Sequence, residues 1–154
     1  MTDNTVPLDY ANSLIYELEK AFWDERGKGA RFRMMNVGQQ YYKDYVKPRI
    51  QTDVVEDILE QVGCVLQEKG IVAELSYNRE ERLLKVGMRS CIHRPVEERM
   101  LAKDVEPFTC IPANLVILAI EEKLDIPVEL AEIKVEEGNC KLILVLFEKR
   151  PVLA

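Results

Sequence analysis

Residues 108–127, FTCIPANLVILAIEEKLDIP, decide the fold of this chain, because they combine a helix start, an apolar helix interior and a helix stop. Pro112 suits the first turn of a helix, where its missing N–H would be unpaired in any case. Residues 114–120 are almost wholly apolar, which is typical of a helix buried on several sides. Asp125 to Pro127 end the helix, since the residue before a proline favours extended backbone. We therefore predict a buried helix with Cys110 at its N-terminus.

Two strands are predicted to follow this helix as a hairpin. Residues 128–135 and 140–147 have strand-like composition, and Glu136-Glu137-Gly138-Asn139 between them is typical of a turn. Cys140 opens the second of these strands. A thiol at a helix start and a thiol at a strand start are thereby predicted in neighbouring elements.

Three further helices are predicted in the first half of the chain. Apolar residues repeat at helical spacing from Leu8 to Trp23. A second helix is expected over residues 34–46, ending before Pro48. A third begins at the capping-box spacing of Asp53-Val54-Val55-Glu56 and ends at Gly70. Its buried stripe comprises Val55, Ile58, Leu59, Val62 and Leu66.

The remaining pattern completes the architecture. Residues 71–77 and 82–89 alternate as two strands of a hairpin do. The 18 residues between Cys91 and Cys110 contain no clear strand, although residues 96–102 favour a short helix. Helices, hairpin, buried helix and second hairpin together predict an α+β fold, with helices on one face of a four-stranded antiparallel sheet. We expect one domain over residues 1–154.

The composition excludes several classes of protein. With 47% hydrophobic and 31% charged residues, the chain has the balance of an ordered domain. No apolar run reaches the ~18 residues of a membrane span, and the N-terminus lacks a signal-peptide pattern. The net charge of -6 disfavours general nucleic-acid binding, which needs a basic field. We therefore expect a cytoplasmic protein with no membrane span and no nucleic-acid partner.

One local exception to the acidic balance follows the first helix. Arg26, Lys28, Arg31 and Arg33 form a basic cluster beside two glycines. Such a cluster is typical of a solvated loop, and its alternative role is an anion site or a partner-docking edge. The sequence leaves both readings open.

The cysteines and the single histidine are the strongest candidates for chemistry. Cys91, His93, Cys110 and Cys140 lie at the ends of predicted elements, where side chains can converge, and thiolate and imidazole are ligands that zinc prefers. The alternative is that the thiols pack as small hydrophobes. Cys64 points away from the buried stripe of its helix, so it is either exposed or covered by another element or subunit. An iron–sulfur or thiol redox protein would use Cys91, Cys110 and Cys140, with Cys64 as a fourth ligand.

The last 45 residues resemble the 4-vinyl reductase domain family, which is related in fold to TRAPP vesicle-tethering subunits. The residues that carry the likeness are Ala113 to Val116, Leu124 to Val128, Glu132, Glu137 to Cys140, and Phe147. The resemblance implies a small-molecule-binding domain, often dimeric, that in some members holds zinc through cysteines and a glutamate.

By position, the resemblance implies Cys110, Glu132 and Cys140 as zinc ligands. Where those members carry a further cysteine, this chain has Val135, so the site is lost or Cys91 or His93 replaces the missing ligand. If Val135 pairs with Cys140, Glu132 faces away from that thiol, because side chains alternate along a strand.

These observations predict a ligand-binding or sensory domain for a small apolar or aromatic molecule, and they favour a binding protein over an enzyme. Its pocket is expected between helices and sheet, and zinc is the expected cofactor. We also expect a homodimer, with Phe22-Trp23 and Cys64 at the interface. A non-catalytic interaction scaffold is the further alternative. The predicted pocket residues are Met34, Tyr41, Tyr42, Tyr45 and Phe108.

Overall fold

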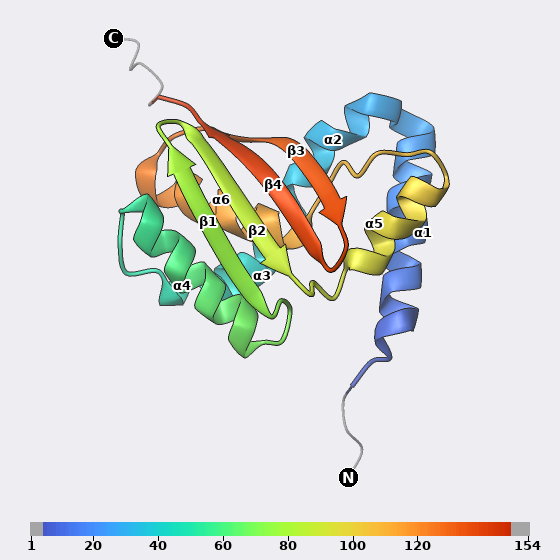
Figure 1. Cartoon of the computed structure of the whole chain (residues 1–154), viewed down its shortest axis with the longest axis horizontal. Helices are drawn as coiled ribbons and strands as arrows, with labels where there is room; N and C mark the ends of the chain where they lie inside the picture. Colours follow the sequence, from blue (N-terminus) through green and yellow to red (C-terminus); the bar gives the residue numbers. More distant parts are fainter. Residues whose placement is uncertain (1–4, 149–154) are drawn as a thin grey trace.

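Two β-hairpins form one antiparallel sheet in the computed structural model, which describes residues 5–148 except for the side chains of Phe32 and Arg33. The strands are β1 (Glu74–Glu80), β2 (Leu83–Arg89), β3 (Val128–Glu136) and β4 (Asn139–Leu146), in the order β1-β2-β4-β3 (Figure 1). This arrangement confirms the predicted α+β fold. The Arg33 side chain of the predicted basic cluster lies outside the described residues.

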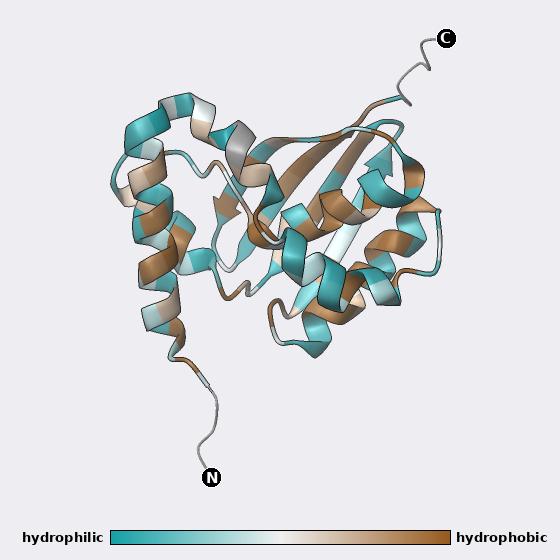
Figure 2. Ribbon diagram, turned by 180° about the vertical axis from the view of Figure 1, so that it is seen from behind, coloured by the Kyte–Doolittle hydropathy of each residue, from teal (hydrophilic) through white to brown (hydrophobic). Residues whose placement is uncertain are grey.

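Helices α4 (Val55–Glu68) and α6 (Ile111–Leu124) cover one face of this sheet (Figures 1 and 2). The opposite face of the sheet is open towards the viewer in Figure 1. Lys85 and Lys141 are exposed and alternate along β2 and β4 with buried residues such as Leu84 and Leu142. Strand alternation explains the difference, because residues at i and i+2 share a face. The predicted arrangement of helices on one face is therefore confirmed.

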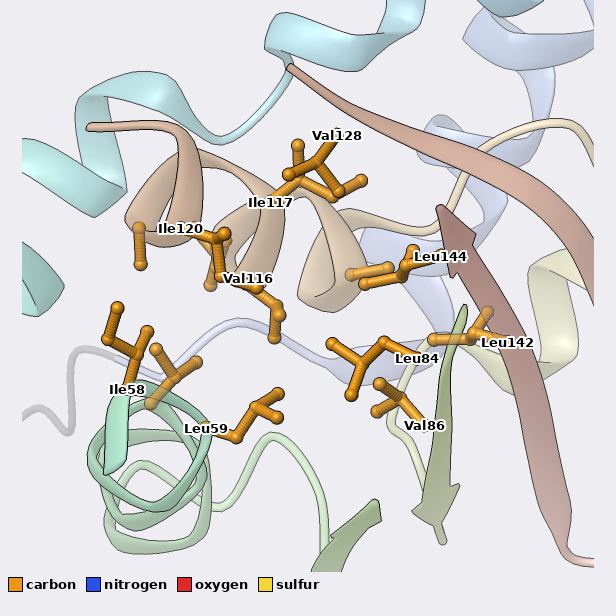
Figure 3. Packing of buried hydrophobic residues seen from close by; sticks show 14 of the residues in the cluster. Ile58, Leu59, Leu84, Val86, Val116, Ile117, Ile120, Val128, Leu142 and Leu144 are labelled. Atoms are coloured by element: carbon orange, nitrogen blue, oxygen red, sulfur yellow. The ribbon is translucent and has the colours of Figure 1, made fainter. Parts of the chain in front are cut away.

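The main hydrophobic core fills the space between α4, α6 and the sheet. The close view of Figure 3 shows side chains from all three pointing towards one another. Burying each such side chain contributes roughly 1.5–3 kcal/mol to folding. Fully or almost fully buried members include Ile58, Leu59, Leu84, Val86, Val116, Ile117, Ile120, Leu142 and Leu144.

Helix α6 forms where the sequence predicts it, with Pro112 in its first turn. Its end has a different cause from the predicted one. Asp125 adopts a left-handed conformation with φ 53°, and its N–H donates to the Glu121 carbonyl. This C-terminal turn ends the helix at Leu124, three residues before Pro127.

Strand β1 begins later than its sequence pattern suggests. Gly70 has φ 71°, and the N–H of Ile71 donates to the Leu66 carbonyl at 2.9 Å. Ile71 and Val72 therefore belong to the C-terminal turn of α4, because their N–H groups point back at that helix. The ladder starts at Glu74, which pairs with Arg89.

The helix predicted over residues 34–46 is broken. A 3₁₀ turn, Met34–Asn36, precedes the one-turn helix α3 (Gln39–Tyr41), and a π-helical turn, Tyr42–Val46, follows it. Gly38 separates the two parts at φ 101°, a conformation that a side chain strains. A Cβ at Gly38 would also approach Leu115 to 3.4 Å, so the break fits closely against α6.

The capping box predicted at Asp53 is wrong. Val54 is the N-cap residue of α4, and no side chain caps the helix there. The N–H of Val54 donates instead to Oγ1 of Thr52 at 3.1 Å. The start of the helix is displaced by one residue, because the extended backbone runs on through Val54.

A second, smaller core joins α1 (Leu8–Arg26) and α5 (Arg94–Ala102) to α2 (Ala30–Arg33) and to the connection before α6. Helices α1 and α5 lie side by side at one end of the sheet (Figures 1 and 2). Within residues 5–148, no helix is both long and apolar enough to cross a membrane. The buried members of this second core are Ala30, Met100, Val105 and Phe108.

Candidate functional site

A cleft runs beside β3, an edge strand of the sheet, where the connection before α6 and helix α2 approach it. It consists of two cavities of about 320 Å³ and about 270 Å³, and Arg31, Phe108 and Leu130 line both. We name the larger the Glu132 cavity and the smaller the Thr109 cavity, after one residue of each. The largely apolar wall of the Thr109 cavity includes Met35, Phe108, Pro127, Val128, Leu130 and Phe147.

Arg31 stands between the two cavities. Its guanidinium donates a hydrogen bond to the backbone carbonyl of Leu130 on β3. A bulge follows directly, since the register of β3 against β4 shifts between Leu130 and Glu132. Arg31 is therefore held by β3 of its own chain rather than fully solvated, and an anion site or a partner-docking edge at the basic cluster stays a prediction.

Phe108 forms the wall that the cavities share. The aromatic rings of Phe108 and Trp23 lie 5.3 Å apart between centroids, which is a favourable aromatic contact. Met34 is half-buried against the same small core. The predicted pocket residues Phe108 and Met34 thus belong to one small core, although Met34 lines neither cavity, and packing from α1 holds Phe108 in place.

Thr109 supplies the unusual polar group of the site. The residue is only 4% exposed, and its hydroxyl Oγ1 is buried without a hydrogen-bond partner. Leaving such a group unpaired costs about 1–3 kcal/mol. Asn114 also lines the cavity, but its side-chain amide already has partners. Its Nδ2 donates to the carbonyls of Met34 and Val37, each at 3.0 Å. The Thr109 hydroxyl is therefore an unsatisfied polar group in the wall of this cavity.

The predicted tyrosines gather in another part of the molecule. Tyr42 is buried in the main core, and burial followed by the nearby Glu122 carboxylate raises its pKa to about 12. The rings of Tyr41 and Tyr45 lie 4.7 Å apart, and Tyr45 is 50% exposed beneath the Lys69 ammonium. The structure therefore does not bring the tyrosines together with Phe108.

Three of the cysteines are buried near one carboxyl group. Burial is the main cause that raises the pKa of Cys91 to about 11 and of Cys140 to about 12, and it raises that of Cys110 as well. The charge of Glu97 adds to the rise for all three thiols. Thiols with raised pKa values stay protonated at neutral pH, which disfavours a nucleophilic cysteine. Cys64 is exposed on α4, as one reading of its sequence position predicts.

Glu97 of α5 and Glu19 of α1 form a buried pair of carboxyl groups between the two helices. Burial, followed by the charges of Glu19 and Glu98, raises its pKa to about 8. Burial raises the pKa of Glu19 to about 7. Glu97 is only 6% exposed, and its Oε2 has no hydrogen-bond partner. Both carboxyls therefore hold their protons far more strongly than exposed glutamates do.

His93 is occupied by a contact with α1 rather than turned to the thiols. Its Nδ1 lies 3.1 Å from Oδ1 of Asn12, whose Nδ2 donates to the Ile92 carbonyl at 2.7 Å. With Asn12 oriented in this way, the proton of the neutral imidazole sits on Nδ1. Burial lowers the pKa of His93, so the ring is neutral at physiological pH.

The residues predicted to bind zinc therefore divide between two places. Val135 pairs with Cys140, and Glu132 is exposed at the cleft, away from the buried thiols. Within residues 5–148, no group of three or more His, Cys, Asp or Glu side chains is arranged to hold a metal ion. The thiols, as they stand, do not fit a zinc ion, and zinc binding stays a prediction.

Sequence reasoning missed Thr109, Arg31 as a wall of the cleft, and Glu97. A signal for Glu97 exists, because Val96 and Met100 mark the buried side of the short helix that contains it. Thr109 gives no such signal. Its burial depends on β3, which is distant in the sequence.

A scan against models of protein families finds no match, and a search of curated proteins finds no similar sequence. Among solved structures, the chain is similar to one titled for probing the function of heme distortion in the H-NOX family. The two are 16% identical, with a TM-score of 0.46, over 90% of this chain and 73% of the other. We draw no functional conclusion from a likeness of this size.

Proposed function

We propose that this protein binds a small, largely apolar molecule carrying one hydrogen-bonding group, and that the Thr109 cavity is the binding site. The observation that carries the proposal is the buried Thr109 hydroxyl, which lacks a hydrogen-bond partner at the wall of a largely apolar cavity. Small-molecule sites combine an apolar wall with a few convergent polar groups in this way. A ligand hydroxyl or carbonyl would supply the missing hydrogen bond.

The size of the cleft supports a ligand of one or two rings. The Thr109 cavity of about 270 Å³ lies just below the usual range of small-molecule pockets, roughly 300–1,000 Å³. Withdrawal of the Arg31 side chain from the Leu130 carbonyl would join it to the Glu132 cavity. Arg31 would then limit the length of the ligand.

Paired probes that differ in one hydroxyl test the proposal. We expect 4-propylphenol to bind more tightly than propylbenzene, because only the phenol can pair with Thr109. Trp23 reports binding, since it is the single tryptophan and contacts Phe108. Isothermal titration calorimetry gives the affinities, and Trp23 fluorescence excited at the red edge confirms the location.

Two variants separate the polar contact from the apolar wall. Thr109→Val keeps the shape and removes the hydroxyl, so it should weaken 4-propylphenol binding about 3- to 10-fold and leave propylbenzene unchanged. Phe108→Ala should weaken both probes. Binding of neither probe, or equal weakening of both by Thr109→Val, would contradict the proposed site.

Zinc binding and the family resemblance remain separate proposals that no step of this binding requires. Elemental analysis of protein purified without chelator tests the first. If zinc is bound, Cys110→Ser and Cys140→Ser should lose it, whereas Cys64→Ser should keep it, because Cys64 is exposed on α4.

A further inference from the structure

Helix α1 carries exposed apolar residues in addition to Tyr16, Phe22 and Trp23, which pack against the smaller core. Its buried residues are Asn12 and Glu19, both polar. Leu18 is 72% exposed and Leu14 is 42% exposed, although a surface helix usually turns such residues towards the core. Figure 2 shows hydrophobic segments recurring along α1 at the side of the molecule. Tyr10 and Leu8 extend the exposed apolar surface towards the start of the helix.

The inner side of α1 explains this orientation. Asn12 donates to the Ile92 carbonyl and contacts His93, and Arg99 of α5 donates to the Ser13 hydroxyl at 3.1 Å. The guanidinium of Arg99 also lies over the Tyr16 ring. Polar contacts therefore fix one side of α1 on α5, and the leucines face outwards as a result.

The exposed stripe has the spacing of a coiled-coil seam. Ala11, Leu14, Leu18 and Ala21 follow one another at intervals of three, four and three residues. Residues with this spacing face a partner helix along one line. Ala21 is exposed, and Ala11 is half-buried, so small side chains alternate with large ones along the seam.

We infer that this face of α1 binds the same face of a second copy of the chain, with the two helices antiparallel. A symmetric dimer needs one self-complementary surface, and a seam centred on Leu18 is self-complementary. The predicted homodimer thereby receives a specific interface.

The charges of α1 decide the orientation. Glu25 continues the seam four residues after Ala21 and is exposed. Parallel helices would place Glu25 against its own copy, and facing like charges destabilise a helix pair. In the antiparallel pair centred on Leu18, Glu25 faces Ala11 of the second copy. The two helix dipoles then point in opposite directions, which is the favourable arrangement.

Other partners fit this surface less well. Asp9, Glu17, Asp24 and Glu25 are exposed on α1, and the chain carries a net charge of -6. Anionic lipid and nucleic acid both require a basic surface. A second copy meets the stripe with its own leucines and needs no basic residues.

The length of α1 limits the strength of this dimer. Nineteen residues span about 28 Å of helix, which is about five turns of seam in all. The contact would lie near the lower end of specific interfaces, which begin at roughly 1,200 Å² of total buried area. We therefore expect a reversible monomer–dimer equilibrium at micromolar concentration.

The Phe22-Trp23 part of the predicted interface changes accordingly, whereas Cys64 is exposed on α4 and its place at an interface stays a prediction. Phe22 and Trp23 are half-buried against the second core, where Trp23 contacts Phe108. These rings face the protein, and Leu14 and Leu18 replace them as the apolar surface of the helix.

Sedimentation equilibrium with matched leucine variants tests the interface. Leu14 on α1 and Leu83 on the outer face of the sheet are both 42% exposed, so Leu14→Glu and Leu83→Glu remove equal exposed surfaces. We expect the wild type and Leu83→Glu to dimerise and Leu14→Glu and Leu18→Glu to remain monomers, with unchanged circular dichroism. A wild type that sediments only as 17.8 kDa up to about 100 μM overturns the inference. Dissociation by Leu83→Glu, or a Leu14→Glu variant that still dimerises, overturns it as well.

Disulfide crosslinking tests the orientation in a Cys64→Ser background, which removes the exposed native thiol. Antiparallel helices predict that Ala11→Cys combined with Glu25→Cys gives a crosslinked dimer under mild oxidation, whereas Ala11→Cys alone does not. A crosslink through Ala11→Cys alone would show parallel helices and overturn the antiparallel arrangement.

Discussion

The region of α4, α6 and the sheet differs from the region of α1 and α5 in what holds each together. The first is a continuous apolar core, with Leu59, Leu84 and Ile117 almost fully buried. The second contains the buried polar residues Asn12, Glu19 and Glu97. Apolar burial is independent of pH, whereas buried carboxyls depend on their protonation. The comparison teaches that one chain can combine an apolar core whose stability does not depend on pH with a helix pair, α1 and α5, whose packing does depend on pH.

The candidate ligand site lies between these two regions. Phe108 belongs to the smaller core, and Leu130 belongs to the main core. Both line the cleft beside β3. A change in how α1 packs on Phe108 would therefore directly change the wall of the cleft. The following predictions probe the comparison, beginning with the largest expected effect.

Truncating the main core should have the largest effect. Leu59→Ala removes a fully buried side chain between α4 and α6, and we expect a loss of about 2–5 kcal/mol in the free energy of unfolding. Denaturant unfolding followed by circular dichroism measures it. Leu101→Ala, at a 43% exposed position of α5, is the control and should change stability by less than about 0.5 kcal/mol. Equal losses would contradict the difference between the regions.

Stability should fall as pH rises, because of Glu97 and Glu19. The pKa of Glu97 rises from an ordinary 4.5 to about 8 in the folded chain, so between these values the unfolded chain releases a proton that the folded chain retains. Unfolding is then favoured by rising pH, and the loss is complete above pH 8. Glu19 adds a similar loss between 4.5 and about 7. Thermal unfolding at a series of pH values from 5 to 9 measures the slope.

Glu97→Gln sharpens this prediction by removing the titrating group at nearly constant size. At pH 9 the variant should be more stable than the wild type, by on the order of 2 kcal/mol, and at pH 5 it should differ little. Glu98→Gln is the matched control, since Glu98 is exposed and pairs with Arg94. If Glu98→Gln flattens the pH profile as much as Glu97→Gln does, the buried carboxyl is not the cause.

Removing Asn12 should loosen α1 selectively. Asn12→Ala deletes the hydrogen bond to the Ile92 carbonyl and the contact with His93, at a cost of about 1–2 kcal/mol. Hydrogen exchange should become faster in α1 and stay unchanged in α6, because α6 lies in the main core. Exchange followed by mass spectrometry resolves the two helices. Faster exchange in both would show that the regions unfold together.

A surface ion pair beside the main core should have the smallest effect. Arg49 donates to both carboxylate oxygens of Glu68, at 2.7 and 3.0 Å, and both side chains are exposed. Arg49→Ala should lower stability by only about 0.2–1 kcal/mol, and less at high salt. Denaturant unfolding at low and high ionic strength checks this. A larger loss that salt does not reduce would indicate packing by the arginine stem rather than charge.

Much of the framework follows from local patterns in the sequence. The second hairpin, the stripe of α4 and the apolar run of α6 occur where periodicity predicts them, whereas β1 runs from Glu74 to Glu80 instead of over residues 71–77. The pairing of Val135 with Cys140 follows from a two-residue turn with Gly138 at φ 76°. These features depend on residues a few positions apart, and the chain geometry links such residues in any fold. For this reason they can be predicted without knowledge of the rest of the molecule.

The broken helix at Gly38 marks the limit of local prediction. Residues 34–46 have helical periodicity, and the close fit of Gly38 against Leu115 and Ile111 determines the break. Likewise, the tyrosines of this segment looked suited to a pocket, whereas Tyr42 is drawn into the main core. Packing against a helix some 70 residues away has more effect here than local preference.

The sequence by itself determined helices α1, α4 and α6, the second hairpin and the apolar core between α4, α6 and the sheet, because each is specified by spacing along the chain. Only the tertiary structure decided the candidate site and the outward face of α1. Arg31 meets Leu130 across 99 residues, and Asn12 meets Ile92 across 80. Which side of α1 is buried depends on the polar partners that α5 and His93 offer. Contacts of this range arise from the packing of whole elements, and hydrophobic spacing alone would have turned the leucines of α1 inwards.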